Sequence, residues 1–109
     1  MIPQIRKYHV VTVHFGKEET TKTLIGQLLS GEKIPDSVVV IDHAQKPLII
    51  ENRDQVRLIR PEKNVGYGAG INLGLGVLTG LGISQEDIVI ALNNDVEVSP
   101  QSLARLEEW

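Results

Sequence analysis

Cysteine is absent from the 109-residue sequence, and aromatic residues are scarce, with one Phe, one Trp and two Tyr. Without cysteine the chain has no disulfide bond, no thiolate ligand for a metal ion and no cysteine nucleophile. This composition is compatible with a reducing compartment, and we expect a cytoplasmic protein. Because aromatic residues are so few, the core must be built from aliphatic side chains.

Long apolar runs and an excess of positive charge are also missing. No stretch approaches the ~20 apolar residues that span a bilayer. The segment from Met1 to Lys7 has neither the apolar region nor the small-residue cleavage site of a signal peptide. The 11 basic and 14 acidic residues give a net charge of −3, which argues against a general grip on nucleic acid or on an anionic membrane. We therefore expect a soluble protein with no nucleic-acid partner and no integral membrane segment, although one anionic small molecule could bind locally.

Strand-like and helix-like patterns alternate along the chain, whose length is that of one domain, residues 1–109. Strands that alternate with helices form right-handed βαβ units. The predicted fold class is therefore α/β: a three-layer α/β/α arrangement with a mostly parallel, Rossmann-like sheet. Strands are predicted at 9–15, 37–42, 56–59 and 88–92; helices are predicted over 18–30, in the second half of a glycine-rich segment up to 81, and from 100 onward; segment 48–50 is either a short strand or a connection.

Terminal signals accompany two of the predicted helices. Gly31 follows the first helix, in the position where a C′ glycine ends many helices. Ser99 and Pro100 form a typical start, an N-cap followed by proline at the first helical position. The last helix is expected to turn Leu103 and Leu106 inward.

Two predicted strands end in carboxylates. Residues 88–92 are an uninterrupted apolar run, which is typical of a strand buried on both faces, and Asn93-Asn94-Asp95 follows it. Strand 37–42 ends in Asp42. In open α/β sheets ligands bind at the carboxyl ends of the strands, so Asp42 and Asp95, which we expect to end adjacent strands, are candidate site residues. The alternative is that these polar residues only mark where strands meet loops.

The glycine-rich segment 63–74 follows the third strand and leads into a helix. Gly66, Gly68 and Gly70 do not complete a Gly-x-Gly-x-x-Gly fingerprint in either frame, and no P-loop sequence is present. What remains is a loop whose backbone amides could receive a phosphate group. Gly74 and Gly76 lie inside the predicted helix, where each costs about 1 kcal/mol relative to Ala. Such glycines indicate close backbone packing or close approach of a ligand.

Oxygen ligands at the end of strand 88–92 suit a hard divalent cation. Asn93, Asn94 and Asp95, with Glu97, could contribute, because Mg²⁺ and Mn²⁺ often take one or two protein carboxylates and complete their shell with substrate phosphates and water. The histidines offer no such site. His9, His14 and His43 lack metal-ligand spacing.

Four motifs, taken in order, resemble the nucleotide-sugar-binding half of the inverting family-2 glycosyltransferases with the GT-A fold. The chain looks most like the rhamnosyltransferase-like branch. Val13-His-Phe-Gly16 stands where that branch has Val-Asn-Tyr-Asn, and Val40-Ile-Asp-His-Ala-Gln45 stands where it has Val-Val-Asp-Asn-Ala-Ser. Asn64-Val-Gly-Tyr-Gly-Ala-Gly-Ile-Asn-Leu-Gly74 follows Asn-x-Gly-Phe-(x)3-Gly-x-Asn-x-Gly, and Leu92-Asn-Asn-Asp-Val96 follows Leu-Asn-Pro-Asp-Val.

The resemblance implies binding of a nucleoside-diphosphate sugar with Mg²⁺ or Mn²⁺, and in the family the sugar is transferred to an acceptor with inversion. The metal neutralises the leaving diphosphate. By resemblance, Asp95 would bind that metal. The other implied nucleotide-sugar-binding residues are His14, Asp42, Asn64, Gly66, Asn72 and Asn93.

The chain departs from the family pattern in two ways. His14, Gly16, His43 and Gln45 replace residues usual around the nucleotide. The acceptor half, which carries the general base, is expected to be missing, so no catalytic residue is assigned. A non-catalytic module for binding or assembly is therefore an alternative, and self-association through the surface that the missing half would cover is one hypothesis for it. A nucleotidyltransferase is a third interpretation, although it would need a basic glycine-rich loop early in the chain.

Overall fold

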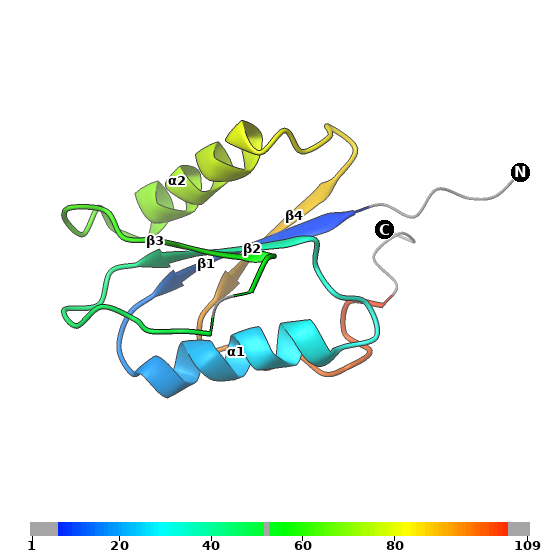
Figure 1. Ribbon diagram of the computed structural model, residues 1–109, viewed down its shortest axis with the longest axis horizontal. Coiled ribbons are helices and arrows are strands. Elements are labelled where there is room, and N and C mark those ends of the chain that lie inside the picture. The colour runs from blue at the N-terminus through cyan, green and yellow to red at the C-terminus, as the bar shows by residue number, and fades with distance from the viewer. Residues whose placement is uncertain (1–6, 52, 105–109) are drawn as a thin grey trace, which may run out of the picture.

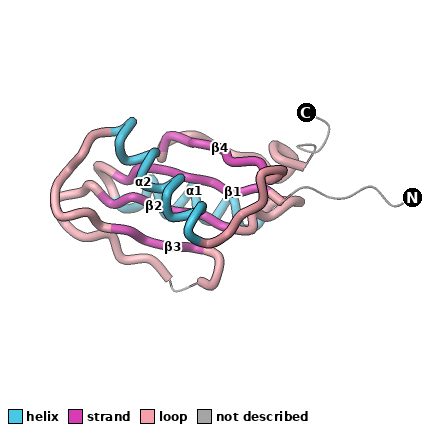
Figure 2. Tube along the Cα trace, turned by 90° about the horizontal axis from the view of Figure 1, so that it is seen from above, coloured by secondary structure: helices cyan, strands magenta, loops and turns pink. Residues whose placement is uncertain are grey.

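The computed structural model describes residues 7–51 and 53–104, which form one parallel sheet between two helices (Figure 1). The four strands lie in the order β3-β2-β1-β4, and every neighbouring pair is parallel. Figure 2 shows this order from above. The elements along the chain are β1 (Tyr8–His14), α1 (Glu18–Ser30), β2 (Ser37–Asp42), β3 (Val56–Ile59), α2 (Tyr67–Gly80) and β4 (Ile88–Asn93).

The two helices cover opposite faces of the sheet, so the predicted three-layer α/β fold is confirmed (Figure 1). Alternate residues of each strand face opposite helices. Val10 and Val38 pack with Leu24 and Leu28 of α1. On the other face, Val11, Val13, Val39 and Ile41 pack with Leu78 of α2.

The predicted boundaries of α1, β2 and β3 are confirmed, because strong local patterns and clear breaks flank each of them. Segment 48–50 is a connection and not a strand, although its first residue, Leu48, is buried. None of the helices within the described ranges has both the length and the hydropathy that crossing a bilayer requires.

The prediction that residues 88–92 are buried on both faces is wrong. β4 is an edge strand, and among the described residues it pairs only with β1. Its side chains are therefore half-buried or exposed. The expectation that Asp42 and Asp95 follow adjacent strands is also wrong, because β1 lies between β2 and β4.

Both predicted terminal signals behave differently from expectation. Gly31 has φ −75°, which is not the left-handed conformation of a C′ glycine. Helix α1 instead ends in extended backbone at Gly31. The next amide, that of Glu32, donates a hydrogen bond to the Pro100 carbonyl at 2.9 Å. After Pro100 the chain makes turns and not a helix as far as residue 104. The Ser102 hydroxyl accepts from the Ser99 amide, which favours this turn over the predicted N-cap. Leu106 lies outside the described residues.

Candidate functional site

Polar residues at or directly after the ends of all four strands form a row at the carboxyl edge of the sheet. His14 pairs with Asp42 in the register of β1 and β2. The last pairs with the outer strands are Ile41 with Ile59 and Val13 with Asn93. One residue further along, Arg60 therefore stands beside Asp42, and Asn94 stands beside His14. The row consists of Arg60, Asp42, His14 and Asn94, in spatial order from β3 to β4.

Asp42 is the buried anchor of this row. Its carboxylate accepts hydrogen bonds from the amides of Ala44 and Leu48, at 3.0 and 2.7 Å, and from the Arg60 guanidinium at 3.0 Å. Arg60 also donates to the Gln45 carbonyl at 3.2 Å. Burial alone would raise the pKa of Asp42, but these donors outweigh it and lower the pKa. Asp42 thus fixes the loop 43–48 as a charged carboxylate, with its oxygens engaged by its own chain.

His14 is held from the side of α1. Its Nδ1 lies 2.5 Å from the Thr21 hydroxyl, and the same hydroxyl accepts a hydrogen bond from the Asn94 amide nitrogen at 3.0 Å. Asn94 donates its other amide hydrogen to the Phe15 carbonyl at 3.0 Å. Burial lowers the pKa of His14, and the opposing influence of Asp42 and Glu18 is smaller, so the imidazole is neutral at pH 7.

A cavity of about 410 Å³ opens beside His14, between the end of β1 and the loop that Asp42 holds. The resemblance implies a base and ribose pocket at this position. The seven lining residues combine the ends of β1 and β2 with the start of α1: His14, Gly16, Glu18, Ala44, Gln45, Lys46 and Leu48. Among the polar residues around the cavity, Gln45 and Lys46 are exposed, whereas His14 is buried, with 1% of its surface accessible.

The glycine-rich loop reaches the same edge on the opposite face of the sheet. The Asn64 side chain accepts a hydrogen bond from the Gly66 amide at 2.8 Å, and Gly66 has φ +85°, a conformation that favours glycine. α2 begins directly afterwards, with no side-chain cap and no acidic residue in its first turn. Gly70, one turn later, brings this end of α2 against the sheet, since a Cβ there would lie 3.0 Å from Val13 and 3.2 Å from His43.

The remaining predicted residues are not brought together with His14 and Asp42. Asn72 is exposed and lies two residues from both Gly70 and Gly74, which face the sheet, so it belongs to the outer side of α2. Asn93 ends β4 and is exposed. Asp95 is exposed in the following turn, and Glu97 lies away from it, beside Gln27 and Ser30.

The donors present fit a shared cation and do not form a complete protein site. No group of three or more His, Asp or Glu side chains able to hold a metal occurs within residues 7–51 and 53–104. Asp95 therefore offers a single carboxylate at an open edge. That arrangement suits Mg²⁺ or Mn²⁺ only when phosphate oxygens and water supply the other ligands.

Residues 9–109 match the family model described as "Glycosyl transferase family 2". The chain belongs to this family. Its fold is similar to that of S. aureus TarS, in a crystal structure of residues 1–349, with a TM-score of 0.67 and 17% identity. The likeness covers 94% of this chain and 31% of the TarS chain, and it confirms the GT-A architecture. Comparison with curated protein sequences gives no significant match.

Two residues of this row and its contacts, Arg60 and Thr21, are missing from the sequence-based candidates, and Asn94 is predicted only as a possible cation ligand. Arg60 directly follows β3 and Asn94 directly follows β4, whereas His14 and Asp42 are the last residues of β1 and β2. A polar residue at the end of a strand is therefore the signal that identifies Arg60 and Asn94 as site residues. Thr21 has no such signal, because it lies inside α1 and reaches the row only through the packing of that helix.

A second hollow, of about 900 Å³, lies at the opposite, amino edge of the sheet. His9 and Asp87 meet there, with Nε2 and Oδ2 2.9 Å apart. The hydrogen bond from His9 is the main reason that the pKa of Asp87 is lowered. This pair joins the start of β1 to the turn before β4, and it lies a full strand length from the carboxyl edge where the family motifs converge.

Proposed function

We propose that the carboxyl edge binds a nucleoside-diphosphate sugar together with Mg²⁺ or Mn²⁺, and that the chain supplies the donor-binding part of a family-2 glycosyltransferase. One observation carries this proposal. The cavity of about 410 Å³ beside His14 lies at the same sheet edge as Asp95 and the start of α2. A ligand with its base in the cavity and its diphosphate near Asp95 would lie across the end of β1, the strand between β2 and β4.

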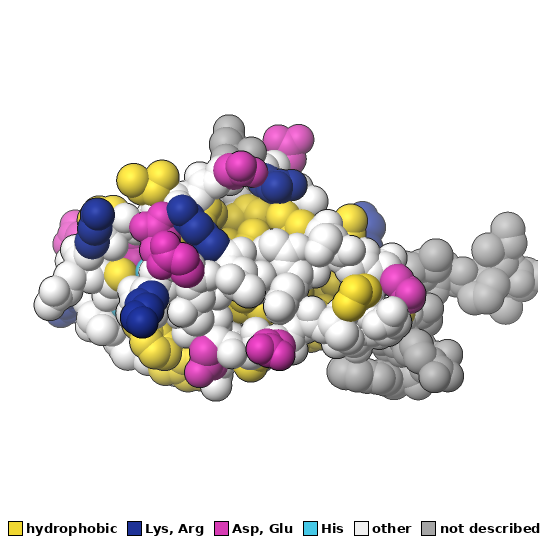
Figure 3. All heavy atoms as spheres, turned by 90° about the horizontal axis from the view of Figure 1, so that it is seen from below, with side chains coloured by type: hydrophobic (Ala, Val, Ile, Leu, Met, Phe, Trp, Pro, Cys, Tyr) yellow, Lys and Arg dark blue, Asp and Glu magenta, His cyan; other side chains and the backbone are white. Residues whose placement is uncertain are grey.

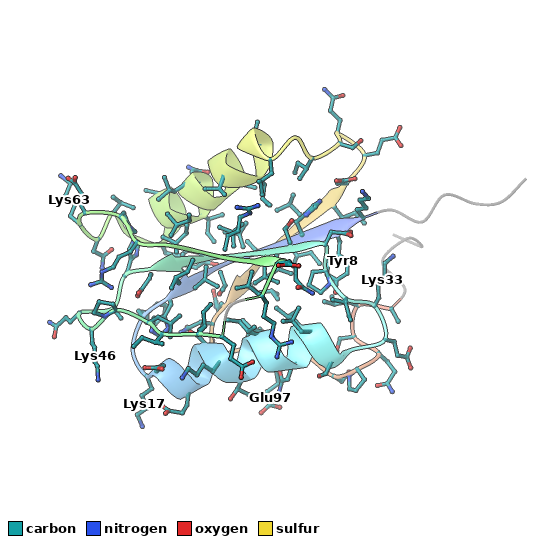
Figure 4. All side chains as sticks on the ribbon, in the orientation of Figure 1. Tyr8, Lys17, Lys33, Lys46, Lys63 and Glu97 are labelled. Atoms are coloured by element: carbon teal, nitrogen blue, oxygen red, sulfur yellow. The ribbon has the colours of Figure 1, made fainter. Side chains whose placement is uncertain are left out.

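Three lysines at this edge could contact an anionic ligand, although the overall charge is −3. Figure 4 shows Lys17, Lys46 and Lys63 at the end of the molecule where the strands finish, whereas Lys33 lies at the other end. Seen from the side of α1, charged side chains of both signs gather toward the same end (Figure 3). Lysines around a phosphate raise its local concentration and offset its charge.

The cation has a defined task in this proposal. Members of the family commonly use a divalent metal. Asp95 would hold it by one carboxylate, and the two phosphates of the donor would provide further oxygen ligands. The ion would stabilise the nucleoside diphosphate as it leaves. The chain spans 31% of the TarS chain. Transfer of the sugar to an acceptor with inversion is therefore proposed for the complete enzyme of which this chain supplies the donor-binding part.

Isothermal titration calorimetry with UDP, dTDP and GDP, each with Mn²⁺, tests the proposal. We expect one of them to bind to the wild-type protein and binding to weaken at least tenfold in Asp95→Ala. Glu97→Ala is the matched control, because this carboxylate is also exposed and only two positions away, but lies beside Gln27 and Ser30. No binding of any nucleotide to wild type, or equal binding by Asp95→Ala, would refute it.

A second candidate function, a non-catalytic module for assembly, is favoured by the edge strand β4. β4 contains no charged residue and no proline, the two common protections of an exposed edge. Two copies could pair through it. Light scattering should then show a concentration-dependent dimer that Ala91→Lys weakens, since Ala91 is exposed on this strand. A monomer at high concentration would exclude assembly through β4, and detectable sugar transfer or donor hydrolysis would exclude a purely non-catalytic role.

A further inference from the structure

The buried contacts of His14 define which of its ring nitrogens carries the proton. The starting point is Asn94, whose side chain is buried and has two partners, the Phe15 carbonyl and the Thr21 hydroxyl. A carbonyl oxygen can only accept, so the amide nitrogen and not the amide oxygen must face Phe15. The second hydrogen of the same nitrogen then points at Thr21, whose hydroxyl accepts it.

The hydrogen bond from Asn94 determines how Thr21 bonds to His14. Its hydroxyl has one hydrogen to donate, and among the described residues it has two partners, Asn94 and His14 Nδ1. Asn94 is a donor here, so the acceptor available for that hydrogen is Nδ1. A neutral imidazole that accepts at Nδ1 carries its proton at Nε2. The lowered pKa of His14, caused by burial, is consistent with the neutral ring.

The other side of the ring belongs to the cavity. His14 lines the cavity of about 410 Å³, and because Thr21 engages its Nδ1, Nε2 is the ring nitrogen left for a ligand in that cavity. The neighbouring loop that closes the cavity is fixed by Asp42, which gives the ring a rigid wall on its β2 side. His14 therefore presents a neutral, oriented N–H donor beside the cavity.

We infer that Asn94 and Thr21 are positioning residues that hold His14 in its Nε2–H form, and that His14 donates this hydrogen to a carbonyl oxygen on the base of the bound nucleotide. This inference rests on the proposed function for its ligand. A fixed donor matches the ring carbonyls of uracil, thymine or guanine. Adenine has no carbonyl, and its acceptors are ring nitrogens set back from where a carbonyl oxygen stands, so a donor fixed for a carbonyl would meet the adenine amino group or a misplaced acceptor. His14 is thus a specificity-determining residue.

The arrangement also depends on a residue in which this chain differs from the family pattern it resembles. Asn94 stands where Leu-Asn-Pro-Asp-Val has proline, and a proline side chain could donate no hydrogen bond to Thr21. Asn94 directly precedes Asp95, so the same contact ties the turn that carries the expected metal ligand to the wall of the base cavity.

Nuclear magnetic resonance of the whole chain, labelled with ¹⁵N in histidine, tests the first half of the inference. Long-range ¹H–¹⁵N correlations distinguish protonated from bare ring nitrogens, and His14→Gln assigns the signals by their loss. We expect His14 to have a bare Nδ1 and a protonated Nε2 at pH 7 in the wild type. A protonated Nδ1, or an even mixture of the two forms, would overturn the inference.

Two substitutions at one position test the second half. Thr21→Val removes the hydroxyl at similar size, whereas Thr21→Ser retains it. In Thr21→Val we expect the single Nε2–H form of His14 to be lost. With Mn²⁺ present, UDP binding should weaken about tenfold while ADP binding is unchanged, so the ratio of UDP to ADP affinity falls. Thr21→Ser should keep both the Nε2–H form and the wild-type affinity ratio. An unchanged ratio in Thr21→Val would refute the donor role of His14.

The two levels of the proposal fail in different ways. If the wild type binds no nucleotide at all, the proposed function is refuted and the role of His14 toward a base is refuted with it. If the wild type binds UDP and ADP equally well while His14 is in the Nε2–H form, the proposed function stands and the specificity role is refuted.

Discussion

Gly74 of α2 lies directly on Val11 of β1. A Cβ atom at position 74 would stand 2.3 Å from Cγ1 of Val11, well inside van der Waals contact. Val11 is completely buried at the centre of the sheet, so it has no free space to retreat into. The absent side chain therefore sets how closely α2 approaches the sheet, and α2 in turn carries the glycine-rich loop to the carboxyl edge.

Substituting this glycine should destabilise the protein, although alanine is the better helix former. We expect Gly74→Ala to lower the free energy of unfolding by about 1–3 kcal/mol, because overpacking against Val11 outweighs helix propensity. Gly76→Ala in the same helix meets no atom within 4 Å and should raise stability by up to about 1 kcal/mol. Urea denaturation followed by circular dichroism measures both. Equal effects of the two substitutions would contradict the close contact.

Removing the Asp42 carboxylate should cost much more than removing an exposed one. Asp42→Ala leaves the amides of Ala44 and Leu48 and the Arg60 guanidinium without their acceptor, and we expect a loss of about 3 kcal/mol. The control is Glu51→Ala, which breaks the ion pair with Arg53. The Glu51 side chain is 83% exposed, so the expected loss is below about 0.5 kcal/mol. Similar losses in both variants would show that the contacts of Asp42 do not order the loop.

Stability should fall as the pH falls from about 6.5, the pKa of an unperturbed histidine, because burial lowers the pKa of His14 in the folded state. In that range the unfolded chain binds a proton at His14 that the folded protein excludes. The loss should level off once the pH is below the folded pKa. Urea denaturation at several pH values measures it, and His14→Gln should weaken the dependence. An unchanged dependence in His14→Gln would mean that other groups cause it.

A second acid-induced loss is expected at lower pH, from carboxylates whose pKa is lowered in the folded state. Buried Asp42 is kept charged by its hydrogen-bond donors, which outweigh the effect of burial, and Asp87 is kept charged mainly by His9. Their contribution to stability is present above the pKa of an unfolded aspartate, about 3.9, and is lost as the pH falls below it. An Asp87→Asn variant should therefore lose less stability than the wild type between pH 4 and pH 2, and an equal loss would argue against the His9 contact.

Chelation should remove the stabilisation that a nucleotide gives. A ligand at a hundred times its Kd raises the free energy of unfolding by about 2.7 kcal/mol, which a thermal shift detects. With UDP and Mn²⁺ we expect such a shift in wild type and in Glu97→Ala, and its loss on addition of EDTA. A shift that survives EDTA would mean that the nucleotide binds without a cation, and the role of Asp95 would have to be abandoned.

Local pattern was sufficient for the elements themselves. The β-branched runs at Ser37–Asp42 and Val56–Ile59 and the apolar stripe of Glu18–Ser30 coincide with β2, β3 and α1. Each of these segments carries its own periodicity and is closed by its own breaks, so no distant residue is needed to define it. The alternation of such elements also determines a parallel α/β sheet, because the connection between parallel strands must cross over one face.

Strand order was decided only by tertiary structure. The apolar run Ile88–Leu92 has the composition of a central strand, yet β4 lies at the edge and β1 separates it from β2. The backbone of a strand makes the same hydrogen bonds with any neighbouring strand, so the sequence of one strand does not determine which strand lies beside it. The candidate site depends on that order. With β1 in the middle, His14 stands between Asp42 and Asn94, and Thr21 joins them from a helix whose sequence shows only an amphipathic pattern.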